Sequence, residues 1–67
     1  MKIDCNYDKI RIMHDLLRLK WFINKHAIED AKKAGHEECE AFYQELANDL
    51  DRKITKLKDL IKKDSLE

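Results

Sequence analysis

Histidine and cysteine are the side chains of this sequence best suited to hold a metal ion. His36 and Cys39 are three positions apart, a spacing that places two ligands one turn apart on a helix. A complete site needs more ligands, and His14 and His26 fall several turns away. Cys5 could approach Cys39 only from a second chain arranged antiparallel to the first. A small apolar core residue is the simpler role for Cys39, and we expect no metal or other cofactor.

Motifs for enzyme chemistry are missing where a helical protein would carry them. Di-iron bundles need a Glu-x-x-His pair, but the residues three positions before the histidines are Arg11, Ile23 and Lys33. The single glycine, Gly35, rules out a glycine-rich phosphate loop, and no serine is placed to form a catalytic triad. We therefore expect a protein that is not an enzyme.

The composition favours long helices. The 67 residues include one glycine and no proline, and 42% are charged, with fourteen of each sign. Balanced charge with periodic apolar residues is typical of amphipathic helices and not of disorder. There is no apolar run of the roughly 18 residues that a membrane span needs, no apolar leader and no CxxC pair. We expect a cytoplasmic protein with no membrane partner.

Gly35 divides the sequence into two expected helices, one over about 7–34 and one over about 36–64. Lys32 and Lys33 suit the negative end of the first helix dipole, and a glycine next to them suits a helix C-terminus. Each helix would be about 42 Å long. Equal lengths predict an antiparallel hairpin forming a single domain, 1–67. A continuous helix is the alternative, with Gly35 tolerated in its interior at about 1 kcal/mol.

Apolar residues form two adjacent rows on the first helix, a face wider than one partner helix covers. The first row is Ile10, Met13, Leu17, Ala27, Ala31 and Ala34, and the second is Ile12, Leu16, Leu19 and Ile23. The second helix has one broad row: Cys39, Tyr43, Leu46, Ala47, Leu50, Ile54, Leu57, Leu60 and Ile61. A second hairpin would cover the part of the apolar face that the partner helix leaves exposed. We therefore expect an all-α, homodimeric four-helix bundle.

The charge distribution indicates how two hairpins would stack. Residues 29–51 hold eight acids and two lysines, residues 8–25 five bases and two acids, and residues 52–63 six bases and one acid. Antiparallel stacking would place each acidic turn beside the basic open end of the other chain. A simpler alternative is that the charged residues only complement the dipole of each helix. This alternative does not explain the basic residues of the first helix.

Four residues are candidates for protein contacts. Lys20 and Asn24 interrupt the first apolar row, where polar residues often fix register and oligomeric state; lining a binding groove is their alternative role. Trp21 and Phe22 lie outside the centre of the apolar face, and such aromatics are enriched at binding hot spots; packing within a wider bundle is their alternative. We expect a protein–protein interaction or regulatory module whose partner is itself or another protein.

A basic run in the second helix suggests a different partner. Arg52, Lys56, Lys62 and Lys63 could contact the phosphates of RNA or DNA. The net charge of zero argues against broad phosphate binding, and lysines at a helix C-terminus are commonly just solvated. Nucleic-acid binding is therefore the alternative function.

Two family resemblances bear on this prediction. The layout, two equal helices around one glycine, resembles the Rop family of hairpins, which dimerise into four-helix bundles and bind paired RNA loops. Its core pattern differs residue by residue, so only the layout carries over. Gln44, Glu45 and Leu46 resemble the Ser-Gln-Glu-Leu-Asp signature of hairpin phosphatases that act on phosphorylated response regulators. Tyr43 and Ala47 replace its serine and aspartate, and a phosphatase-like hairpin is the third alternative.

Overall fold

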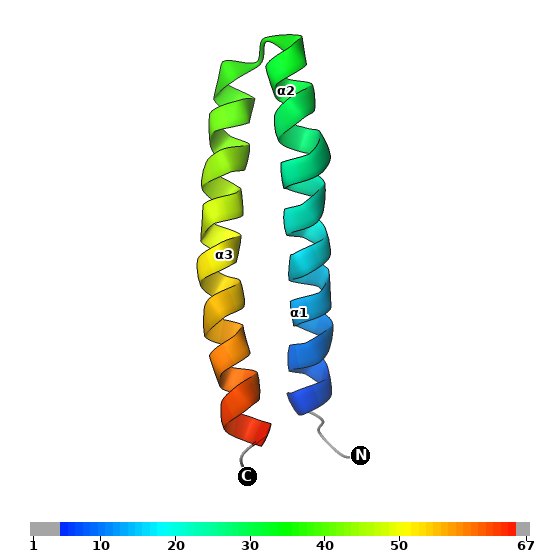
Figure 1. Cartoon of the computed structure of the whole chain (residues 1–67), viewed down its shortest axis with the longest axis vertical. Coiled ribbons are helices and arrows are strands. Elements are labelled where there is room, and N and C mark those ends of the chain that lie inside the picture. Colours follow the sequence, from blue (N-terminus) through cyan, green and yellow to red (C-terminus); the bar gives the residue numbers. More distant parts are fainter. Residues whose placement is uncertain (1–4, 66–67) are drawn as a thin grey trace.

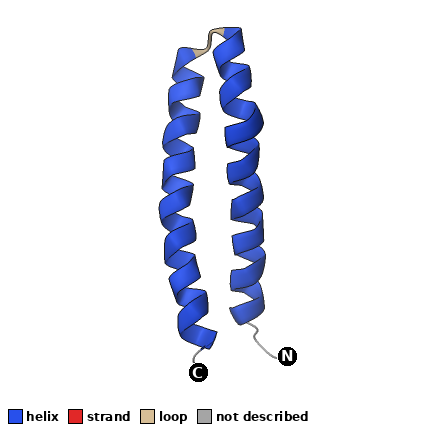
Figure 2. Cartoon of the chain, in the orientation of Figure 1, coloured by secondary structure: helices blue, strands red, loops and turns tan. Residues whose placement is uncertain are grey.

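The computed structural model describes residues 5–65, with side chains as far as Lys63, and shows two long antiparallel helical arms (Figure 1). The first arm consists of α1 (Cys5–Phe22), a π-helical turn η1 (Ile23–Ala27) and α2 (Ile28–Ala34). The second arm is α3 (Glu37–Ser65). The described part of the chain contains no strand (Figure 2). This confirms the all-α hairpin; residues 1–4 and 66–67 of the expected domain lie outside the described residues.

A glycine-centred turn joins the arms. Gly35 has φ 75° and ψ 20°, the left-handed conformation. Its N–H donates to the carbonyl oxygen of Lys32 at 3.2 Å, and the N–H of His36 donates to that of Ala31 at 2.9 Å. These two bonds form the Schellman motif that ends a helix. Because left-handed backbone disfavours residues with a β-carbon, Gly35 is what reverses the chain in place of one continuous helix.

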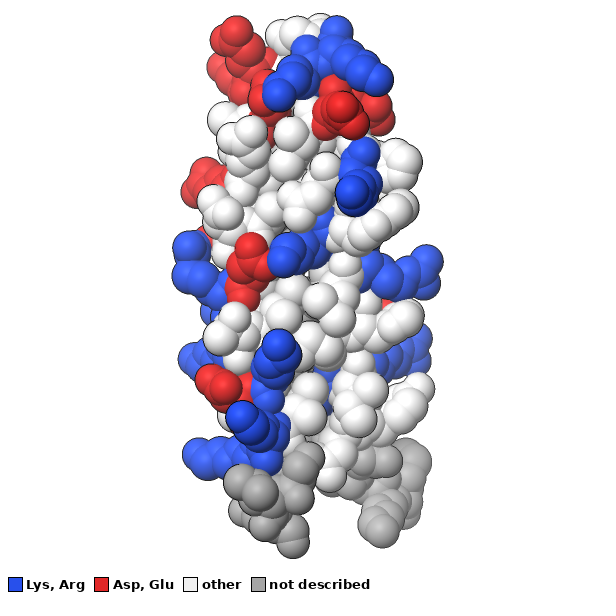
Figure 3. Space-filling model, in the orientation of Figure 1, with Lys and Arg blue, Asp and Glu red and all other residues white. Residues whose placement is uncertain are grey.

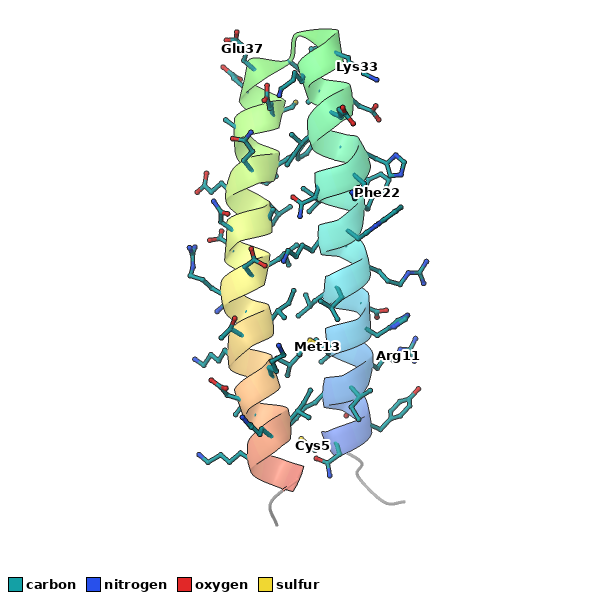
Figure 4. All side chains as sticks on the ribbon, viewed as in Figure 1. Cys5, Arg11, Met13, Phe22, Lys33 and Glu37 are labelled. Carbon is teal, nitrogen blue, oxygen red and sulfur yellow. The ribbon has the colours of Figure 1, made fainter. Side chains whose placement is uncertain are left out.

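The core between the arms is one narrow row. On α3 its positions alternate at intervals of three and four, which keeps one side of the helix towards the first arm. These positions are Tyr43, Ala47, Leu50, Ile54, Leu57 and Ile61. The first arm contributes Met13, Leu16, Ile23 and Ile28. Met13 points at α3, whereas Arg11 projects from the opposite side of α1 (Figure 4).

The contact line on α1 runs between the two apolar rows expected from the sequence. Met13 from the first row and Leu16 and Ile23 from the second pack in the core. α3 covers about one row, and successive residues are about 100° apart around the helix. The large side chains of each row on α1 that lie off this contact line therefore stay exposed on its two flanks. The exposed residues are Ile10 and Leu17 on one flank, and Ile12 and Leu19 on the other.

The π-helical turn shifts the phase of the first arm by about one residue. The N–H of Ile28 donates to the carbonyl oxygen of Ile23, five residues back instead of four. Residues five apart therefore share a side here, and both Ile23 and Ile28 contact the core. The same widening brings the ring of His26 within 5.3 Å of that of Trp21, centroid to centroid. The periodicity of the sequence predicts a regular helix here and gives no sign of the π-helical turn.

Candidate interaction surfaces

About half of the large apolar side chains that the structure describes are exposed. The buried residues are Ile23, Ala31, Ala47, Leu50 and Ile54, two of them alanines. By contrast, nine large apolar residues are 43–58% exposed, and seven of these lie on α1. Scattered exposed apolar residues need no explanation, but contiguous ones indicate interaction sites. The arrangement of these residues on the two flanks is therefore the informative feature.

One face of the hairpin carries apolar side chains from both arms. We call this the shared face and define it as Ile12, Leu19, Phe22, Phe42, Leu46 and Leu60. A shallow pocket lined by Phe22 and Cys39, among others, bridges the arms on this side. Leu46 and Leu60 follow Cys39 at multiples of seven residues, so they share its side of α3. Leu19 lies three residues before Phe22, and Ile12 lies seven residues before Leu19, so both continue along the same flank of α1.

A second apolar strip lies on the opposite flank of α1. We call this the outer strip and define it as Tyr7, Ile10, His14, Leu17 and Trp21. These residues alternate at intervals of three and four, the spacing of a helix side that faces another helix. All five are exposed. On this flank the arms are bridged by an ion pair between Lys20 and Asp51 of α3, so α3 adds charge here in place of an apolar row.

The four residues predicted to make protein contacts lie in different environments in the structure. Trp21 belongs to the outer strip and Phe22 to the shared face, and both rings lie against His26. Phe22 projects from α1 away from α3 (Figure 4). Asn24 is exposed beside the outer strip. Lys20 is half-buried and forms an ion pair with Asp51 of the other arm.

The predicted nucleic-acid residues are all exposed but do not form one row. Arg52, Lys56 and Lys63 follow at intervals of four and seven, on the side of α3 away from α1. Lys62 is turned by about 100° from Lys63. Arg52 forms an ion pair with Asp49, so part of its charge is balanced within the chain. Figure 3 shows basic side chains gathered along the lower part of α3.

The metal-ligand residues are spread over the hairpin. Within the described residues, no three side chains of histidine, cysteine, aspartate or glutamate lie close enough to hold a metal ion. Cys5 and Cys39 are exposed free thiols near opposite ends of the hairpin. The prediction that the protein needs no cofactor stays a prediction. In the same described part of the chain, no helix has the length and apolar character needed to cross a membrane.

The sequence indicates an apolar face wider than one partner helix covers, but not the division of this face into two surfaces. The spacing of the outer strip, from Tyr7 to Trp21, was present in the sequence as a signal. Two of its residues, Ile10 and Leu17, fall in the same predicted row as Met13, which packs in the core, and this overlap hides the separate strip. The partner of Lys20 had no such signal, since Asp51 lies on the other arm.

Comparison of the chain with protein-family models, curated proteins and solved structures finds no match. The geometry of the shared face, the outer strip and the charged ends is therefore the basis for functional inference.

Proposed function

We propose that this chain is a protein–protein interaction module that acts as a homodimer, with two hairpins packed through their shared faces in an antiparallel four-helix bundle. The observation that carries the proposal is the exposure of the shared face, in which only Leu46 is half-buried, beside a core of five buried residues. A second copy presents the same apolar rows on both arms, as a two-fold interface requires. Burying one leucine or phenylalanine side chain contributes about 1.5–3 kcal/mol.

Charge supports the antiparallel orientation. Acidic residues gather near the turn, among them Glu37 and Glu38, and bases gather near the open end, among them Lys62 and Lys63. Asp51 is the midpoint of α3 (Glu37–Ser65). In an antiparallel pair centred at this level, Glu38 of one chain lies near the level of Lys63 of the other. Opposite charges then meet at both ends, whereas parallel stacking would bring like charges together.

Apolar residues match in the same arrangement. Phe42 and Leu60 are equally far from Asp51, on either side of it along α3. Each Phe42 therefore lies at the level of Leu60 of the other chain, and Leu19, near the middle of α1 and α2 combined, lies close to its own copy. Phe42, Leu60 and Leu19 would thus each have an apolar neighbour in the dimer.

A matched pair of substitutions tests this interface. Leu19 on the shared face is 45% exposed, and Leu17 on the outer strip is 48% exposed. Leu19→Glu removes two leucines per dimer, about 3–6 kcal/mol, and should weaken association at least about 100-fold. Leu17→Glu, the same change on the same helix, should leave the dimer intact. Sedimentation equilibrium over a concentration series measures both.

The outcomes separate the possible interfaces. The 8.0 kDa chain should sediment at twice its mass, and Leu19→Glu should sediment as a monomer. A wild-type monomer at all concentrations would refute the dimer. Dissociation by Leu17→Glu and not by Leu19→Glu would move the interface to the outer strip.

Two other functions have weaker support. The exposed row of Arg52, Lys56 and Lys63 favours nucleic-acid binding as the second candidate. For the phosphatase-like alternative, the position of the signature serine is held by Tyr43, which packs against the core. Its side chain is therefore engaged in the hairpin itself, and this alternative ranks last.

A further inference from the structure

We propose that the outer strip binds an amphipathic helix of a different protein, and that this helix carries acidic residues beside its apolar row. The inference rests on the proposed function, because a dimer formed through the shared faces leaves the outer strip at the surface.

The outer strip contains two hollows of the shape that receives side chains from another helix. The first is lined by His14, Leu17, Arg18, Trp21 and Phe22. The second is lined by Leu17, Lys20, Trp21, Asn24 and Lys25. Each includes four residues at positions i, i+3, i+4 and i+7, which form a hole for a knob from a facing helix. Leu17 and Trp21 line both hollows, so the two holes are consecutive along α1.

No part of the described hairpin fills these holes. Leu17 and Trp21 are 48% and 57% exposed, although both are large apolar side chains. The contact line with α3 lies about 100° away around α1, at Met13 and Leu16. The outer strip is thus a second helix-packing side on the same helix.

A row of bases follows the edge of the strip. Arg11, Arg18 and Lys25 are spaced seven apart, each one position after Ile10, Leu17 or Asn24. All three bases are exposed, and no acidic side chain within residues 5–63 forms an ion pair with them. In coiled coils such flanking positions select a partner of opposite charge. The bases therefore specify glutamate or aspartate on the docking helix.

A second copy of this chain fits the outer strip less well. Two outer strips packed against each other would bring the two rows of Arg11, Arg18 and Lys25 together, and like charges across an interface disfavour binding. The exposed apolar row of α3 is on the shared face, which the proposed dimer already covers. An acidic helix from another protein meets neither objection.

Two synthetic helices of about four heptads test the proposal. Both carry leucine at the core positions; the acidic peptide has glutamate at the flanking positions, and the basic peptide has lysine there. The acidic peptide should bind the wild-type protein, more weakly as salt rises, and the basic peptide should not. Leu17→Glu should weaken binding at least about tenfold, while Leu19→Glu should bind the acidic peptide like the wild type.

A charge-reversal variant gives the decisive comparison. Replacing Arg11, Arg18 and Lys25 together by glutamate should abolish binding of the acidic peptide and create binding of the basic one. Because the mass of every variant is measured in parallel, loss of the dimer and loss of peptide binding are read separately. Leu19→Glu that is dimeric yet binds the peptide would refute only the proposed dimer interface.

Three results would overturn the inference. The first is no binding of the acidic peptide to the wild type at any salt concentration. The second is equal binding of both peptides, or binding unaffected by Leu17→Glu. The third is binding of a labelled single-stranded RNA that Leu17→Glu abolishes while the acidic peptide does not bind, which would make the strip a nucleic-acid site.

Discussion

A left-handed backbone conformation at Gly35 lets the two arms fold back on each other. Its N–H and that of His36 satisfy carbonyl oxygens at the end of α2, so the turn uses backbone groups and needs no side chain. Farther along, Lys20 and Asp51 form an ion pair between the arms. Both side chains are partly exposed, at 32% and 52%, so the pair contributes at most about 1 kcal/mol. Gly35 thus sets the direction of the chain, and apolar packing supplies most of the stability.

Gly35→Ala should destabilise the hairpin by about 1–2 kcal/mol because alanine resists the left-handed conformation. A β-carbon at this position would meet no other atom within 4 Å, so the loss would come from the backbone alone. Urea unfolding at a fixed protein concentration measures the change. Gly35→Asn is the control and should lose less, since asparagine tolerates this conformation. An alanine variant more stable than the wild type would show that the chain prefers a continuous helix.

At the scale of elements, the π-helical turn decides which side chains of the first arm meet α3. The hydrogen bond from Ile28 to Ile23 accommodates one extra residue, so that both isoleucines contact the core. α3 needs no such adjustment, because its core positions keep intervals of three and four from Tyr43 to Ile61. The hairpin therefore pairs one regular helix with one that is rephased near its middle.

Deleting Lys25 should leave the hairpin folded, since it converts the π-helical turn into regular α-helix with Ile23 and Ile28 still on the core side. Helix content and the urea midpoint, measured by circular dichroism, should stay close to the wild type. The control deletes Arg52, an exposed residue in regular α3. That deletion rotates Ile54, Leu57 and Ile61 by about 100° out of the core and should unfold the protein. Similar losses for both deletions would contradict the role assigned to the π-helical turn.

At the scale of the whole molecule, the hairpin is 49 Å long and only 15 Å thick, so it has little interior of its own. A chain of this size buries only about 60% of the surface that its unfolded state exposes, less than larger domains bury, and association is a common remedy. In our proposals the two apolar surfaces bind different partners: the shared face binds a second copy of the chain, and the outer strip binds a helix of another protein. In the same proposal, ends of opposite charge favour antiparallel stacking of the two copies.

Cross-linking of the two cysteines tests the direction in which the two copies stack. Within one chain, Cys5 and Cys39 are about 40 Å apart, from a rise of 1.5 Å per residue, so a short bis-maleimide reagent cannot join them. In the antiparallel dimer, Cys5 of one chain lies at the same end as Cys39 of the other. Cross-linking followed by peptide mapping should therefore give Cys5–Cys39 dimers. Products joining Cys39 to Cys39 would indicate parallel stacking, and Leu19→Glu should give neither.

The sequence by itself determined the helical class, the break at Gly35 and an apolar face too wide for one partner helix. These follow from local properties: the absence of proline, a single glycine and the periodicity of apolar residues. It also singled out Trp21 and Phe22, which the structure leaves exposed on different flanks of α1.

Only the tertiary structure decided which apolar residues the hairpin uses. The contact line through Met13, Leu16 and Ile23 depends on how the two arms pack against each other. The π-helical turn changes which side of the first arm faces α3. The pairing of Lys20 with Asp51 likewise joins residues far apart in the chain. Periodicity fixes the width of an apolar face, but the position of the neighbouring helix fixes which part is covered. The division into a shared face and an outer strip is therefore a property of packing.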